Sequence, residues 1–115
     1  MTLPVAASPD LVLADAARAM LSPQSITLIG ASDKSRWSAS VHDNLVRNGF
    51  AGAIHQVNPR GAAAHGRPCA VSCAAVGERL DLGLVMAPRD AVPQALSDLA
   101  GAGGRSAVIL TAGFA

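Results

Sequence analysis

Residues 25–38 contain the residue types and the spacing best suited to binding a ligand. A short apolar run, rich in β-branched residues, ends at Gly30; small and polar residues follow, and a helical pattern begins near Ser38. A helix that starts just after a parallel strand directs unpaired backbone N–H groups and the positive end of its dipole at the crevice above the sheet. Residues 30–38 are therefore a candidate cradle for a diphosphate. A purely structural turn is the alternative, because a dinucleotide-binding fingerprint places three glycines where this chain has one.

A basic residue follows the second predicted strand. Residues 53–57 have the pattern of a strand, and Pro59 must end it because proline cannot continue a central ladder. A nicotinamide-dinucleotide site usually has Asp or Glu at this point to bind ribose hydroxyls, whereas this chain has Asn58 and then Arg60. A guanidinium there favours a ribose that bears a phosphate. The chemistry indicates a phosphorylated adenosine, which means coenzyme A or else NADP.

Other residues of the glycine turn each have two interpretations. Trp37 either packs over a bound adenine or covers the sheet edge. Lys34 and Arg36 either contact a phosphate or lie with Asp33 in a solvated loop. For Ser32, a capping role is favoured over that of a nucleophile, because the sequence places neither a base nor an oxyanion pair beside it.

A metal site is not expected. His65, Cys69 and Cys73 are spaced at fours, but they straddle a predicted turn, strand and helix, and a fourth ligand is absent. The sequence favours structural roles for all three.

Composition limits the classes of function. The chain has 115 residues, enough for one domain with its own core. Only 15% of the residues are charged and the net charge is +1, so the broad basic field needed for binding nucleic acid is missing. Apolar runs are too short to span a bilayer, and the N-terminus lacks the basic residues that open a secretory signal. We therefore expect a cytoplasmic protein with reduced cysteines.

The elements that must position these residues alternate between strand and helix. The pattern predicts an α/β fold with a doubly wound parallel sheet and helices on both faces. Ligands in such a sheet bind beyond the carboxyl ends of the strands, where we place four loops: 30–38, 58–61, 87–90 and 111–113. The predicted strands are 26–29, 53–57, a short one at 68–71, 82–87 and 107–110; the predicted helices are 9–20, one from near residue 38 to 47, a brief one at 72–77, and one from about residue 90 to 100.

An ordered series of motifs resembles a known family. The motifs are Ser25-Ile26 through Ile29-Gly30-Ala31-Ser32, Asn44-Leu45, Gly49-Phe50-x-Gly52, Val57-Asn58-Pro59-Arg60, Asp81-Leu82, Pro88 and Ala112-Gly113-Phe114. They are similar to the N-terminal CoA-binding domain of NDP-forming acyl-CoA synthetases, relatives of the succinyl-CoA synthetase alpha subunit. The same domain occurs in acetyltransferase fusions that modify protein lysines. The resemblance implies a tail and helix over residues 1–20 and a CoA-binding, Rossmann-like domain over residues 21–115.

The resemblance also implies roles for single residues. The glycine turn would cradle the phosphates, the Asn-Pro-Arg loop would meet the nucleotide end, and two further loops would line the adenine and pantetheine side. The implied coenzyme A contacts are Gly30, Ala31, Ser32, Lys34, Arg36, Trp37, Ser38, Asn58, Pro59, Arg60, Pro88 and Gly113.

The chain departs from the family in two ways. Many relatives have another glycine at the start of the first crossover helix, where this chain has Ser38 and Ala39. The family's phosphohistidine and ATP-grasp regions would lie beyond Ala115, and no histidine of this chain matches the phosphorylated one. We therefore expect the chain to bind coenzyme A or acyl-CoA without catalysing a reaction alone. The alternatives are a stand-alone domain that senses CoA, the CoA-binding part of a lysine acetyltransferase fusion, and a fragment of an NADP-binding oxidoreductase.

Overall fold

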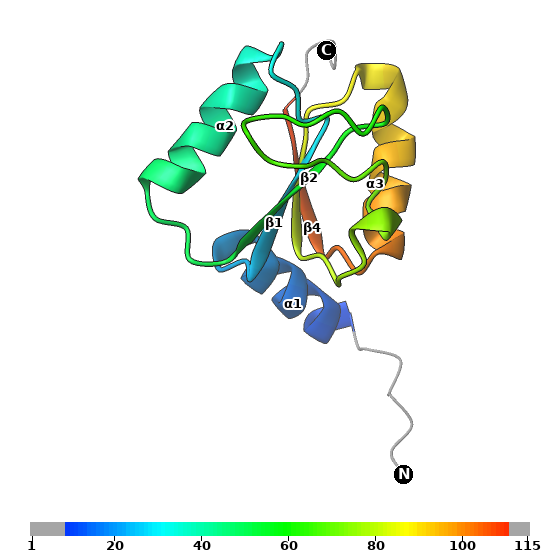
Figure 1. Cartoon of the computed structure of the whole chain (residues 1–115). Coiled ribbons are helices and arrows are strands. Elements are labelled where there is room, and N and C mark those ends of the chain that lie inside the picture. The colour runs from blue at the N-terminus through cyan, green and yellow to red at the C-terminus, as the bar shows by residue number, and fades with distance from the viewer. Residues whose placement is uncertain (1–8, 111–115) are drawn as a thin grey trace.

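A four-stranded parallel sheet forms the centre of the protein, with the strands in the order β2-β1-β3-β4. The computed structural model describes residues 9–110 (Figure 1). Among these residues no helix has both the length and the apolar character needed to cross a membrane. The elements are α1 (Pro9–Leu21), β1 (Ser25–Ile29), α2 (Arg36–Arg47), β2 (Ala53–Val57), a 3-10 turn η1 (Ala74–Val76), β3 (Leu82–Val85), a second 3-10 turn η2 (Arg89–Ala91), α3 (Val92–Gly101) and β4 (Ser106–Ile109).

β1 is the central strand, and all five of its residues are buried. It pairs with β2 on one side, where Ile29 lies opposite Val57, and with β3 on the other, where Ile29 lies opposite Val85. Its mixture of Ile, Leu and Thr suits a strand covered on both faces. The predicted doubly wound parallel sheet is confirmed.

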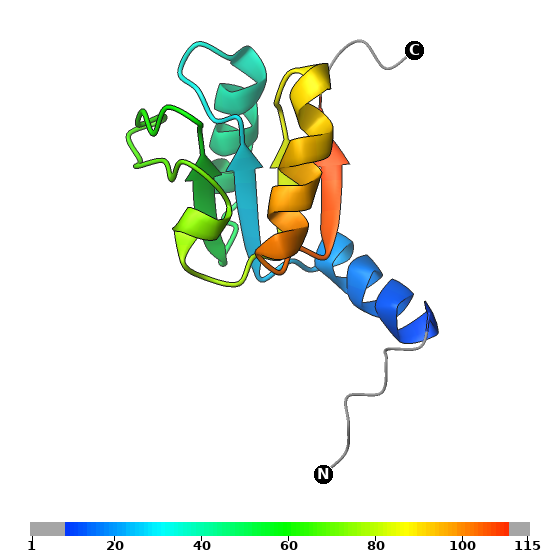
Figure 2. The same cartoon turned by 90° about the vertical axis from the view of Figure 1, so that its right-hand side faces the viewer.

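α2 and α3 lie on opposite faces of the sheet (Figure 2). The α2 face buries Ile26, Leu28 and Leu82, with Val41 and Leu45 of the helix packed against them. The α3 face buries Ile29, Val57, Val85, Val92 and Leu99, among others. α3 approaches β3 closely because Gly83 has no side chain: a Cβ at that position would lie 2.4 Å from Leu99 Cδ2. The sheet therefore separates two apolar layers.

Several predicted elements differ from the structure, and one of them is the strand expected at 82–87, which ends at Val85. α2 begins at Arg36 rather than near Ser38, because the Ser35 side chain accepts the Ser38 N–H and caps the helix there. Residues 68–71 do not form a strand: Ala70 makes a single bridge with Val57, and Pro68 has no N–H to extend a ladder. The predicted helix at 72–77 is one 3-10 turn, and the Ser72 hydroxyl just before it accepts the Ala75 N–H.

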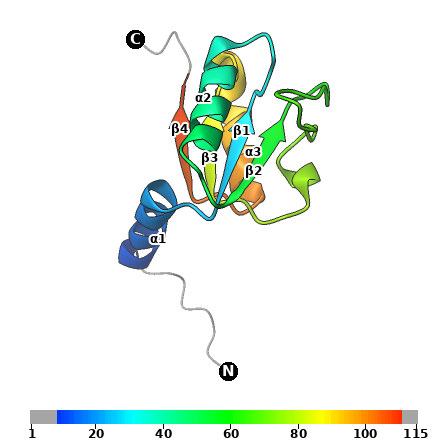
Figure 3. The ribbon, with the colours of Figure 1, turned by 60° about the vertical axis from the view of Figure 1, so that its left-hand side comes forward.

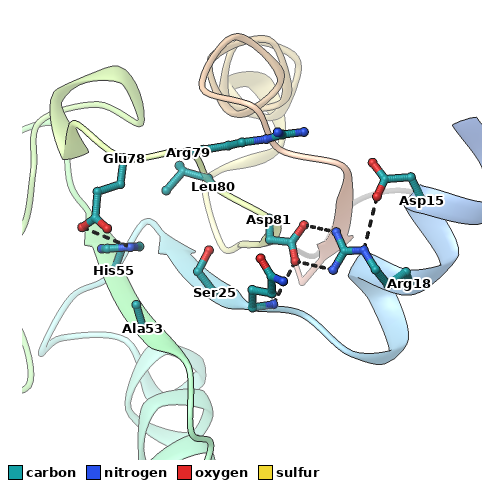
Figure 4. Close-up of a pocket in the computed structure, with 10 residues that line it drawn as sticks. Asp15, Arg18, Ser25, Ala53, His55, Glu78, Arg79, Leu80 and Asp81 are labelled. Carbon is teal, nitrogen blue, oxygen red and sulfur yellow. Dashed lines mark hydrogen bonds and ion pairs between the residues drawn. The ribbon is translucent and has the colours of Figure 1, made fainter. Parts of the chain in front are cut away.

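α1 lies at the base of the sheet, at the amino ends of the strands (Figure 3). Arg18 donates two hydrogen bonds to the Asp81 carboxylate at 2.8 and 3.0 Å, and the Gln24 N–H donates a third at 2.9 Å. Asp15 also accepts from Arg18 and pairs with Arg105. Arg18, Asp81, Gln24 and Asp15 line a hollow of about 380 Å³ (Figure 4). Because its Asp and Arg groups largely pair with one another, we assign this hollow to the docking of α1.

The Asp81 contact makes stability depend on pH. The hydrogen bonds from Arg18, followed by the Gln24 N–H, hold the pKa of the Asp81 carboxyl below its ordinary value. A lowered pKa stabilises the folded state above the unfolded value of about 3.9, and that contribution is lost as the pH falls through the folded value. We expect Asp81→Asn to be less stable than the parent at pH 7, with the difference narrowing below about pH 4. Urea unfolding at several pH values measures this.

Asp90→Asn is the matched control, since the Asp90 side chain is 99% exposed. Its free energy of unfolding should equal that of the parent at each pH tested. A stability difference between Asp81→Asn and the parent that stayed constant down to pH 3 would contradict this role for the carboxylate.

Candidate functional site

The glycine turn after β1 has a structural cause of its own. Gly30 has φ +93°, and its N–H donates to Val57 O at 2.9 Å. A Cβ at this position would lie 3.0 Å from the backbone carbonyl of Met86. Both the left-handed backbone and the close approach of the chain after β3 therefore require glycine here.

Asn58 joins the loops that follow β1 and β2. Its Nδ2 donates to Ala31 O at 2.9 Å, and its Oδ1 accepts the Arg60 N–H at 2.8 Å. The structure therefore brings the glycine turn and the Asn-Pro-Arg loop together at one edge of the sheet, and Pro59 and Arg60 lie exposed beside them. Within residues 9–110 the guanidinium of Arg60 has no hydrogen bond or ion pair, so it is available to an anion.

The start of α2 offers further donors at the same edge. Ser35 caps the helix through the Ser38 N–H, while no partner within the described part of the chain accepts from the N–H groups of Arg36 and Trp37. Free N–H groups at a helix N-terminus attract anions. The side chains of Lys34 and Arg36 are exposed, and Trp37 is 49% exposed. This arrangement has the chemistry to hold phosphate.

The inner side of the glycine turn is closed by side chains. Ser38 is fully buried, and its Oγ accepts the Ser32 N–H at 3.0 Å. His65 Nε2 lies 2.6 Å from the same Oγ, and the His65 N–H donates to Asp33 Oδ1 at 2.8 Å. The order of these groups resembles a Ser-His-Asp triad, but the hydroxyl has no exposed surface for a substrate to reach. The hydroxyl is therefore not placed to act as a nucleophile, and it lies at the start of α2, where the family resemblance expects a glycine at Ser38 or Ala39.

Two histidines of this region were not predicted as site residues. The rings of His42 and His65 stack with their centroids 4.8 Å apart, and Arg67 Nε donates to His42 Nε2 at 2.8 Å. Arginine only donates, so His42 Nε2 carries a lone pair and the ring proton lies on Nδ1. His65 has φ +56° in a turn from Ala64 to Arg67 that is closed by two backbone hydrogen bonds. The one local signal in the sequence was the pair His65-Gly66, which is typical of a turn.

The remaining predicted residues fall into two groups. Pro88 follows β3 and lies exposed before η2, at the same edge as the other loops. Gly113 and its loop lie outside the described residues. Cys69 packs with the α2-side apolar layer and Cys73 is buried in the α3-side layer, so the two thiols lie on opposite sides of the sheet. In residues 9–110 no three His, Cys, Asp or Glu side chains are grouped so as to hold a metal ion.

The fold and the loops at this edge define a Rossmann-like α/β domain. Residues 24–115 match the CoA binding domain family, and the chain belongs to that family. The resemblance seen in the sequence motifs is thereby confirmed.

Relatives with curated functions are larger enzymes. The sequence is 31% identical over 98 residues to acetate–CoA ligase (ADP-forming) II of Archaeoglobus fulgidus, covering 84% of this chain and 15% of that protein. It is 33% identical over 93 residues to the ADP-forming acetate–CoA ligase of Methanocaldococcus jannaschii, covering 80% and 13%. The chain therefore spans about one seventh of the length of these relatives.

A solved structure has the same fold. The dinucleotide-forming acetyl-coenzyme A synthetase 1 of Ca. Korarchaeum cryptofilum, in complex with phosphate and ADP, superposes with a TM-score of 0.77 and 28% sequence identity. The match covers 84% of this chain and 21% of that chain. A domain of this fold is thus part of a much longer synthetase.

The thiols should differ in reactivity. Burial, together with nearby Asp98, raises the pKa of the Cys73 thiol to about 12. Alkylation requires the thiolate, so at pH 8 we expect iodoacetamide to modify Cys73 at least about a hundredfold more slowly in the native protein than in urea. Peptide mapping by mass spectrometry reads both sites in one sample. Burial also raises the pKa of Cys69, which is only partly buried and should react faster than Cys73. Equal native rates would contradict this assignment.

The contact of Asn58 with the glycine turn should contribute to stability. Asn58→Ala removes two hydrogen bonds, so we expect the free energy of unfolding to fall by about 1–2 kcal/mol in a urea titration. Asn44→Ala is the control, because Asn44 is exposed on α2 and its substitution should change stability by less than about 0.5 kcal/mol. If both variants were equally stable, the joining role of Asn58 would be wrong.

Proposed function

We propose that this domain binds coenzyme A at the carboxyl edge of β1 and β2. The observation that carries the proposal is the contact between Asn58 and Ala31, which joins the loop of Arg60 to the glycine turn that leads into α2, where two N–H groups have no acceptor within the described residues. The family match supports it because residues 24–115 include both loops.

The exposed groups at this edge suit the parts of coenzyme A. The N–H groups of Arg36 and Trp37 and the side chain of Lys34 would bind the diphosphate. Arg60 would bind the 3′-phosphate of the ribose, since a guanidinium forms charge-assisted hydrogen bonds with phosphate. The Trp37 indole would pack over the adenine. The loops at Pro88 and Gly113 would line the remainder of the ligand.

We propose further that the domain works as one part of an NDP-forming acyl-CoA synthetase. Its relatives are ADP-forming CoA ligases of which this domain is a small part. In such an enzyme the domain would hold coenzyme A so that its thiol is available for acylation, while phosphohistidine and ATP-grasp regions elsewhere would carry the activating chemistry. No residue of this chain is assigned a catalytic role.

Arg60 should distinguish coenzyme A from dephospho-CoA. We expect the unmodified protein to bind coenzyme A about tenfold more tightly than dephospho-CoA, and Arg60→Ala to remove most of that difference. Calorimetry with coenzyme A, dephospho-CoA, NADPH and NADH measures it, and coenzyme A should bind best.

Arg47→Ala is the matched control, because Arg47 is exposed at the far end of α2. It should keep the preference for coenzyme A. Equal affinity of the parent for coenzyme A and dephospho-CoA would refute the role of Arg60, and tighter binding of NADPH would refute the proposed ligand.

A further inference from the structure

The hydroxyl of Ser38 accepts a backbone N–H of the glycine turn, that of Ser32. Without this hydroxyl, the N–H could donate to a bound phosphate. Ser32 lies at the start of the turn and is partly exposed, and its N–H donates to Ser38 Oγ at 3.0 Å. A phosphate oxygen seated in the turn beside Ser32 would accept from the same N–H group. The serine hydroxyl and the ligand are therefore competitors for one N–H group.

His65 keeps the hydroxyl in this position. Its side chain is only 6% exposed, its Nε2 lies 2.6 Å from Ser38 Oγ, and its backbone N–H donates to Asp33 on the other side of the turn. The ring stacks on His42, which Arg67 in turn contacts. We call Ser38, His65 and Asp33 the clasp. It joins two segments that are far apart in the sequence, the loop at residues 30–38 and the turn at residues 64–67, through two hydrogen-bond contacts.

The backbone at His65 supports the same view. Its φ of +56° is unusual for a residue with a side chain and is the one positive φ outside glycine in the described residues. Asparagine or glycine would fit such a turn with less strain. The chain nevertheless has histidine at this position, and its ring contacts Ser38.

We infer that the clasp lowers the affinity of this domain for a nucleotide diphosphate, and that Ser38 is a residue that tunes this affinity. The inference rests on the proposed function, because it concerns the same site. In this view the Ser38 hydroxyl occupies the Ser32 N–H, so that this N–H cannot donate to the ligand.

Ser38→Ala tests the inference, since it removes the hydroxyl and keeps the Cβ. We expect Ser38→Ala to bind coenzyme A and inorganic pyrophosphate about tenfold more tightly than the parent, because a donor to a charged oxygen becomes free. Without ligand the variant should be less stable, because Ser32 loses its acceptor. Calorimetry measures the affinities, and at saturating pyrophosphate the Ser32 amide resonance should shift further in Ser38→Ala than in the parent.

Ser40→Ala is the control, with the same chemical change at an exposed position of the same helix. It should bind like the parent. Ser38→Gly replaces Ser38→Ala if the latter does not fold, with the same expected gain. If the parent binds coenzyme A and the Ser38 variant binds it equally or more weakly, the inference is overturned while the proposed function stands. If none of the proteins binds coenzyme A or pyrophosphate, both are overturned.

Discussion

The burial of β1 is the constraint on which the rest of the structure depends. This strand has a hydrogen-bonded neighbour on each side and an apolar layer on each face. At the end of this strand the chain turns sharply and passes close to the segment that follows β3. Gly30 makes that turn directly against Met86. All four strands are parallel, so the turns after β1, β2 and β3 open on one edge of the sheet, and any ligand that uses two of them must bind there.

The motif residues at this edge fall into two sets according to what they contact. Gly30 and Asn58 are engaged within the fold, one by close backbone packing and the other by two hydrogen bonds. Their presence is explained without a ligand. The guanidinium of Arg60 and the N–H groups of Arg36 and Trp37 have no hydrogen-bond partner within the described residues. Ligand binding would depend on this second set, and the first set holds it in place.

The sequence allowed the sheet to be predicted because strand signals are local. The residues of β1 and β2 carry their own apolar pattern, and the glycine turn is marked by composition. Two contacts that shape the edges could not be predicted in this way. Ser38 and His65 are 27 residues apart, and Arg18 and Asp81 are 63 apart. Nothing near any of them in the sequence indicates its partner, since only the packing of loops against helices brings them together. The strand predicted at residues 68–71 was wrong for a local reason, because Pro68 has no N–H with which to extend the pairing beyond one bridge.

Two arginines show why position and not residue type separates a structural cation from one suited to a ligand. Arg18 lies at the amino ends of the strands, where Asp81 and Asp15 accept its N–H groups. Arg60 lies at the carboxyl ends, where its backbone N–H donates to Asn58 Oδ1 while its guanidinium has no partner within residues 9–110. An arginine whose donors are already satisfied within the fold gains little from binding a phosphate, because each new hydrogen bond replaces an old one. An exposed guanidinium exchanges only water for the ligand. Arginine at the amino ends of the strands therefore attaches α1 to the sheet. At the carboxyl ends, the guanidinium of Arg60 is available to a ligand.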